Sequence, residues 1–112
     1  MKVVAYVPDL MDRSKVVAAT SGIGAELVAV ASPGRLVDAA VGADVVVVDL
    51  GRPGVLEVIG SLGAVPTVGF ASHVDTDLLR RARQAGCGRV LARSVFFGRL
   101  PATLSAGASP DG

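Results

Sequence analysis

The chain has 112 residues, the size of one domain built around a single core. Hydrophobic residues make up 51% and aromatic residues only 4%, a valine-, alanine- and leucine-rich composition that excludes disorder over most of the chain. Apolar runs such as Val45–Val48 fall far short of the roughly 18 residues that a membrane-spanning helix needs. The net charge is +1, the single cysteine excludes an internal disulfide, and no secretion signal is evident, so we expect a cytoplasmic protein without membrane contact.

The first half of the chain alternates between strand and helix patterns. Val3–Val7 is an apolar run closed by Pro8 and predicts a buried strand. Asp12 is expected to cap a helix that continues to about Thr20. The segments that follow are a strand at 27–31, a helix at 35–41 and a strand at 45–48, whose β-branched valines make it the most strand-like of all.

The second half continues the alternation. The predicted elements are a helix at 53–62, a strand at 67–70, a helix at 75–85, a strand at 89–92 and a weak helix at 95–104. Pro53 suits the start of the first of these helices, and Gly86 suits the end of the second. We expect one domain over residues 1–104, and a flexible tail over residues 105–112 because they are small and polar.

Five strands separated by short helices predict a single α/β domain with a doubly wound parallel sheet. In such sheets the functional site lies at the carboxyl ends of the strands. The polar residues expected at that edge are Asp9, Asp12, Asp49, Ser72, His73, Asp75, Arg93 and Ser94.

Several segments resemble response-regulator receiver domains. Residues 45–53, with Asp49 at a strand end and Pro53 four positions later, resemble the third strand and following loop of that family. Residues 66–72 resemble its fourth strand, 78–87 its next helix and 88–94 its fifth strand. The resemblance implies a flavodoxin-like, CheY-like fold with strand order 2-1-3-4-5. It also implies a two-component phosphoacceptor role for Asp49, supported by Mg²⁺.

The site departs from the family pattern at several positions. After the first strand the family has an acidic pair that holds Mg²⁺, whereas this chain has Asp9 alone, so Asp9 and Asp49 would bind the metal weakly. Ala71 takes the place of the family's Thr or Ser, with Ser72 one position later. Arg93 takes the place of the family's lysine, and a guanidinium does not substitute freely for an ammonium group.

These departures favour a degenerate receiver, a non-enzymatic signalling or scaffold module that acts by protein contact without a cofactor. One alternative is a phosphoacceptor receiver that uses Asp49 with Mg²⁺, supported by Asp9, Ser72 and Arg93. A second is a small flavodoxin-like ligand-binding domain, which the scarcity of aromatic residues disfavours for a flavin. Asp49 could also be only a strand-end residue that caps the next helix or bonds Arg93. One histidine and one cysteine support no nucleophilic triad or pair.

The charge of the chain is unevenly distributed. Residues 1–77 hold five basic and nine acidic residues, whereas residues 78–110 hold six arginines and no acid. Nucleic acid is not an expected partner, because stacking aromatics and known binding motifs are lacking. The predicted interface is the 75–104 face, which would bind a protein partner or a second copy through Phe96, Phe97 and Leu100, with Arg80 and Arg83 at its rim. The alternative is that these arginines form only the solvated face of a helix.

Overall fold

The computed structural model describes residues 1–108. Its strands are β1 (Lys2–Tyr6), β2 (Glu26–Ala29), β3 (Val45–Asp49), β4 (Thr67–Ala71) and β5 (Arg89–Ala92). Its α-helices are α1 (Leu10–Gly22), α2 (Leu36–Ala39), α3 (Val55–Ile59), α4 (Thr76–Gln84), α5 (Arg93–Gly98) and α6 (Leu100–Ala108), with short 3₁₀ turns η1 (Pro33–Arg35) and η2 (Gly60–Leu62). Within residues 1–108, every helix is too short or too polar to cross a membrane.

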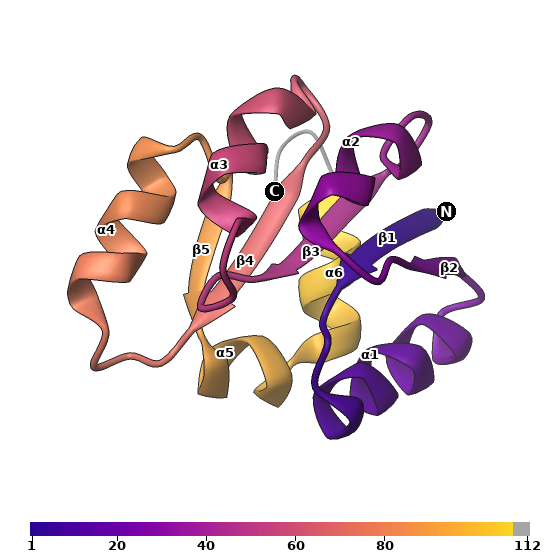
Figure 1. The fold of residues 1–112 in the computed structure, drawn as a ribbon. Helices are drawn as coiled ribbons and strands as arrows, with labels where there is room; N and C mark the ends of the chain where they lie inside the picture. Colours follow the sequence, from indigo (N-terminus) through magenta and orange to yellow (C-terminus); the bar gives the residue numbers. More distant parts are fainter. Residues whose placement is uncertain (109–112) are drawn as a thin grey trace.

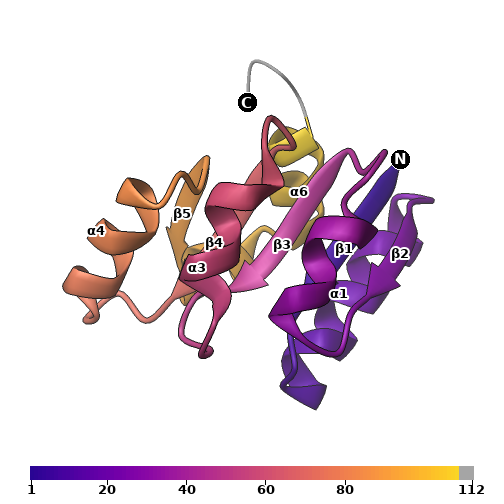
Figure 2. The same ribbon diagram turned by 45° about the horizontal axis from the view of Figure 1, so that its top comes forward.

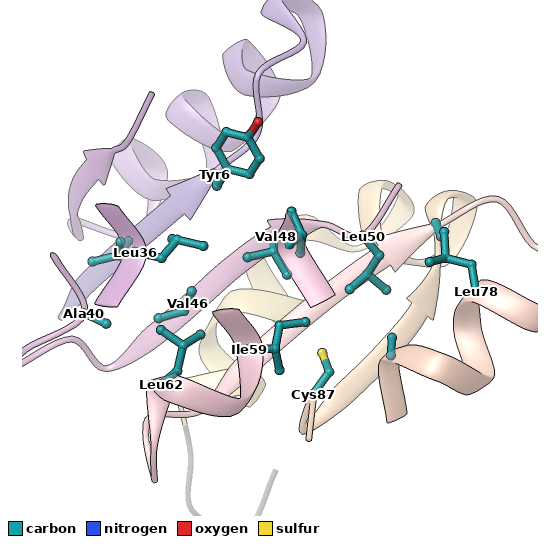
Figure 3. Close-up of a cluster of buried hydrophobic side chains, with 14 residues drawn as sticks. Tyr6, Leu36, Ala40, Val46, Val48, Leu50, Ile59, Leu62, Leu78 and Cys87 are labelled. Atoms are coloured by element: carbon teal, nitrogen blue, oxygen red, sulfur yellow. The ribbon is translucent and has the colours of Figure 1, made fainter. Parts of the chain in front are cut away.

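The five strands form one parallel sheet in the order β2-β1-β3-β4-β5, as predicted (Figure 1). Helices α2, α3 and α4 cover one face, and α1, α5 and α6 cover the other (Figure 2). The β3 valines Val45–Val48 are completely buried because this strand lies in the middle of the sheet, under both helical layers. Figure 3 shows the side chains that fill the space beneath α2, α3 and α4.

The caps of two helices show where the local predictions were right and wrong. Asp75 caps α4, since its carboxylate accepts a hydrogen bond from the backbone N–H of Leu78, and Gly86 follows the helix with a φ of 102°, at the end predicted for it. The prediction for Asp12 was wrong. Helix α1 begins earlier, and its cap is Asp9, whose carboxylate accepts from the N–H of Asp12 at 2.9 Å. The side chain of Asp12 is therefore free for another role.

The end of the chain differs from the prediction. In place of one weak helix over 95–104, a break at Arg99 separates α5 from α6, and α6 continues to Ala108. Pro101 does not interrupt α6 because it lies in the first turn, where its missing N–H would have no intrahelical partner. Residues 105–108 of the predicted tail therefore belong to a helix, and residues 109–112 lie outside the described residues.

The same rearrangement corrects the predicted interface. Phe96, Leu100 and Leu104 are at most 5% exposed and pack against β3 and β4, and Phe97 is half-buried. Two consecutive helices can bury these side chains, whereas one short helix could not turn them all inward. Phe96 and Leu100 are thus core residues and are not available for partner contact, while Arg80 and Arg83 lie on the exposed side of α4.

Candidate functional site

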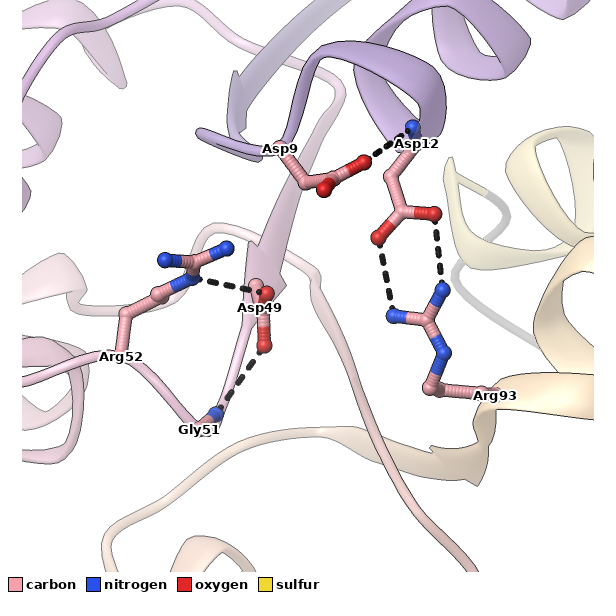
Figure 4. Close-up of polar contacts among 6 residues, drawn as sticks. All are labelled: Asp9, Asp12, Asp49, Gly51, Arg52 and Arg93. Carbon is pink, nitrogen blue, oxygen red and sulfur yellow. Dashed lines mark hydrogen bonds and ion pairs between the residues drawn. The ribbon is translucent and has the colours of Figure 1, made fainter.

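Polar side chains gather at the carboxyl end of the sheet (Figure 4). Asp9 follows β1, Asp49 ends β3, and Arg93 follows β5 at the start of α5. The parallel arrangement brings these strand ends to one edge, as the sequence predicted. Asp12, which the sequence placed at this edge as a helix cap, and Arg52, which it did not place there, complete the group.

Arg93 forms a two-pronged ion pair with Asp12. Its two terminal nitrogens donate to the two carboxylate oxygens at 2.9 and 2.7 Å. The side chain of Asp12 is only 8% exposed, while that of Arg93 is 43% exposed. The hydrogen bonds from Arg93 hold the pKa of Asp12 below its ordinary value, against the opposing effect of burial. The carboxylate of Asp12 is therefore ionised at neutral pH and fully engaged by one guanidinium.

Aromatic rings hold the guanidinium of Arg93 in place. Its central carbon lies 5.5 Å from the ring centre of Phe70 in β4 and 5.1 Å from that of Phe97 in α5. The Phe70 ring also stacks on Phe96, with ring centres 4.7 Å apart. Contacts from β4 and α5, together with the ion pair to α1, thus fix the position of Arg93.

Asp49 has two partners on the loop that follows its own strand. One carboxylate oxygen accepts from the backbone N–H of Gly51 at 3.1 Å, and the other accepts from Nε of Arg52 at 3.2 Å. The interpretation that Asp49 bonds Arg93 was therefore wrong, because Arg93 pairs with Asp12. The bond to Gly51 is a local turn contact two residues along the chain.

The residues at the end of β4 do not supply a hydroxyl group in the expected position. Ala71 is the last residue of the strand and is buried. Ser72 is exposed, and its hydroxyl oxygen accepts from the backbone N–H of Val74 at 3.4 Å. Ser72 thus forms part of the loop before α4.

Asp9 lies three residues before Asp12 and is also a residue type that caps helices. Because Asp9 is the cap, Asp12 falls on the first turn of α1, where its side chain lies beside the strand ends. Arg52 is likewise three residues beyond Asp49, within reach of its carboxylate. Only the folded chain shows that α1 turns Asp12 toward β5.

The carboxylates at this edge accept hydrogen bonds from the protein itself. A Mg²⁺ ion, which is commonly bound through one or two carboxylates and waters, would compete with these donors. Both oxygens of Asp12 accept from Arg93, those of Asp49 accept from Arg52 and Gly51, and one oxygen of Asp9 accepts from the N-terminus of α1. Over residues 1–108, no three Asp, Glu, His or Cys side chains are close enough together to hold a metal ion.

Comparison with solved structures identifies the fold. The chain superposes on a response regulator from Hahella chejuensis with a TM-score of 0.82 and 18% identity, covering 99% of this chain and 97% of the other. The chemotaxis response regulator CheY4 of Vibrio cholerae matches with a TM-score of 0.77 and 18% identity, over 95% and 97% of the two chains. This chain has the fold of a response-regulator receiver domain.

The receiver fold also matches a protein whose metal site is known. The receiver domain of the sensor histidine kinase PA1611 from Pseudomonas aeruginosa, solved with a magnesium ion in its active-site cleft, superposes with a TM-score of 0.77 and 16% identity, over 96% of each chain. Neither protein-family models nor curated protein sequences match this chain. The similarity therefore lies in the receiver fold, and the chemistry of the strand-end site depends on the residues that this chain has there.

Proposed function

We propose that this receiver-fold chain is a signalling module that acts through protein–protein contact and is not phosphorylated at Asp49. The observation that carries the proposal is the ion pair between Arg93 and Asp12. Phosphoryl transfer to a carboxylate depends on positioned cations that neutralise the charge of the transferred group. Here the guanidinium of Arg93 already neutralises the buried carboxylate of Asp12. Asp12 is therefore not free to bind a metal.

The surroundings of Asp49 support the same proposal. Arg52 neutralises its charge, and the N–H of Gly51 occupies its other oxygen. A carboxylate with these partners is a weaker nucleophile than one exposed to solvent beside a bound metal. At the end of β4, Ala71 offers no hydroxyl group to a phosphoryl oxygen. We therefore expect the site to keep one state, without a chemical step or a cofactor.

One observation favours the alternative role of Asp49 as a phosphoacceptor. Asp49 is the last residue of the central strand β3, and its side chain is 13% exposed, so a small phosphodonor could reach it. The partner Arg52 is 41% exposed and lies on a loop, so this ion pair is more easily opened than that of Asp12. The two proposals differ in whether Asp49 gains a phosphoryl group.

The test is incubation with acetyl phosphate and Mg²⁺, followed by intact mass measurement. We expect no change in mass for the wild-type chain or for Asp49→Asn, while an active receiver domain treated in parallel gains one phosphoryl group. A phosphoryl gain in the wild type that is absent in Asp49→Asn would replace this proposal with the phosphoacceptor alternative. Thermal unfolding with increasing Mg²⁺ supplies a second measurement, for which we expect no specific stabilisation.

A further inference from the structure

Strand β2 forms an open edge of the sheet, and Figure 1 shows it beyond β1 with no further strand beside it. The backbone N–H of Glu26 donates to the carbonyl oxygen of Met1, and that of Val30 donates to the carbonyl oxygen of Ala5, both at 2.9 Å. Alternate residues of a strand direct their backbone groups to opposite sides. The N–H and C=O groups of Leu27 and Ala29 therefore point away from the sheet, where another strand could bind them.

A groove lies beside this edge on the face that α2 covers. Its volume is about 750 Å³, and its lining residues are Val28, Ala29, Val30, Ala31, Gly34, Arg35, Asp38 and Ala39. The groove exists because α2 has only four residues and leaves the outer part of the sheet uncovered. Val28 and Val30 are consequently only half-buried, although both point toward the core beneath α2.

The wall of the groove carries one basic and one acidic side chain. Arg35 ends η1, and Asp38 lies three residues later in α2. Both are exposed, and neither side chain forms a hydrogen bond or an ion pair within residues 1–108. Residues three apart on a helix lie on the same side, so both charges face the groove.

We propose that a second copy of this chain binds here, with the two β2 strands paired antiparallel across a two-fold axis. This axis would join the two sheets into one and would place the two η1–α2 segments antiparallel on the same face. The start of each segment would then face the end of the other, so Arg35 of each copy would meet Asp38 of the other. A surface with one charge of each sign at this spacing is complementary to itself, which a two-fold interface requires.

The apolar part of the groove supports the same partner. Val28 and Val30 of the two copies would cover one another, and the outward backbone groups of Leu27 and Ala29 would form hydrogen bonds that the single chain lacks. The opposite edge is less suitable. Arg89 lies on β5 and Arg83 on the neighbouring helix α4, so a two-fold axis there would bring like charges together.

The test is sedimentation velocity of the full chain over a range of micromolar concentrations. We expect a monomer–dimer equilibrium that Arg35→Asp and Asp38→Arg each weaken about tenfold or more, because each places like charges opposite one another. The double variant Arg35→Asp/Asp38→Arg should recover most of the affinity, since the charges are then exchanged. Arg83→Asp, a charge reversal of the same size on α4, should leave the dimer unchanged.

A second variant tests the strand pairing apart from the charges. Ala29→Pro removes an outward N–H at an edge position, where proline is tolerated, and should weaken the dimer while the circular dichroism spectrum stays that of the wild type. A wild-type monomer at all concentrations would refute the proposal. A dimer that does not respond to the charge exchange, or one that Arg83→Asp disrupts, would also refute it. These outcomes are independent of the phosphorylation test, because no step here involves Asp49.

Discussion

Arg93 and Asp12 lie 81 residues apart in the sequence, yet their side chains share two hydrogen bonds of 2.9 and 2.7 Å. The pair joins the first turn of α1 to the start of α5, at the carboxyl edge of the sheet. We expect this interaction to stabilise the folded chain.

The first prediction concerns the energy of this pair. Arg93→Ala leaves the buried carboxylate of Asp12 without its partner and should lower the free energy of unfolding by about 2 kcal/mol. A double-mutant cycle with Asp12→Ala should give a coupling energy of about 1–2 kcal/mol in urea unfolding. Arg52→Ala is the matched control, and because its ion pair is more exposed it should cost less than about 1 kcal/mol. Equal losses of stability in Arg93→Ala and Arg52→Ala would contradict the prediction that the buried Arg93–Asp12 pair is the stronger of the two.

The second prediction is the pH dependence of stability that follows from Asp12. Its pKa is lowered in the folded chain, chiefly by the hydrogen bonds from Arg93, so the folded state binds this proton less readily than the unfolded state. The stabilisation is therefore complete above the unfolded pKa of about 4 and is lost as the pH falls through the lower, folded value. In urea unfolding, the free energy of unfolding of the wild type should exceed that of Asp12→Asn at pH 7. This difference should shrink below about pH 4. A difference that does not depend on pH would show that the charge of Asp12 is not responsible.

The third prediction concerns the close contact between β4 and the residue that follows β3. A methyl group added at Gly69 would lie 2.5 to 2.9 Å from three side-chain atoms of Leu50, which is itself only 1% exposed. Gly69→Ala should therefore cost about 1–3 kcal/mol in the free energy of unfolding. Gly98→Ala is the control, because nothing lies within 4 Å of the added methyl group, and its effect should stay within about 0.5 kcal/mol or be stabilising. If Gly69→Ala were neutral, the packing of Leu50 would have to be more adaptable than the structure indicates.

The fourth prediction tests the corrected role of Phe96. The residue is fully buried and stacks on Phe70, so Phe96→Ala should lower the free energy of unfolding by about 3–5 kcal/mol. The neighbouring Val95 is 52% exposed, and Val95→Ala should change stability by less than about 0.5 kcal/mol. Thermal or urea unfolding of both variants provides the measurement. A stable Phe96→Ala variant with altered self-association would restore the interface that the sequence suggested.

The sequence by itself determined the architecture. Five apolar segments rich in branched residues, separated by short helical segments, leave a parallel sheet as the arrangement that buries them, and the connections restrict its order. The Gly86 helix end and the placement of Asp49 at a strand end also followed from local patterns, because helix ends and strand ends depend on neighbouring residues. The end of the last helix did not, since the burial of Leu104 and the continuation of α6 depend on contacts with a distant part of the sheet.

Only the tertiary structure decided the partners at the site. The sequence suggested Asp12 as the helix cap, whereas in the folded chain Asp9 caps α1 and Asp12 bonds Arg93. Asp49 bonds Arg52, three residues along the chain, while Arg93 bonds Asp12. The open groove beside β2 likewise follows from how little of the sheet the short α2 covers. Pairings between residues far apart in the chain are set by the relative positions of whole helices and strands, which a local sequence pattern does not contain.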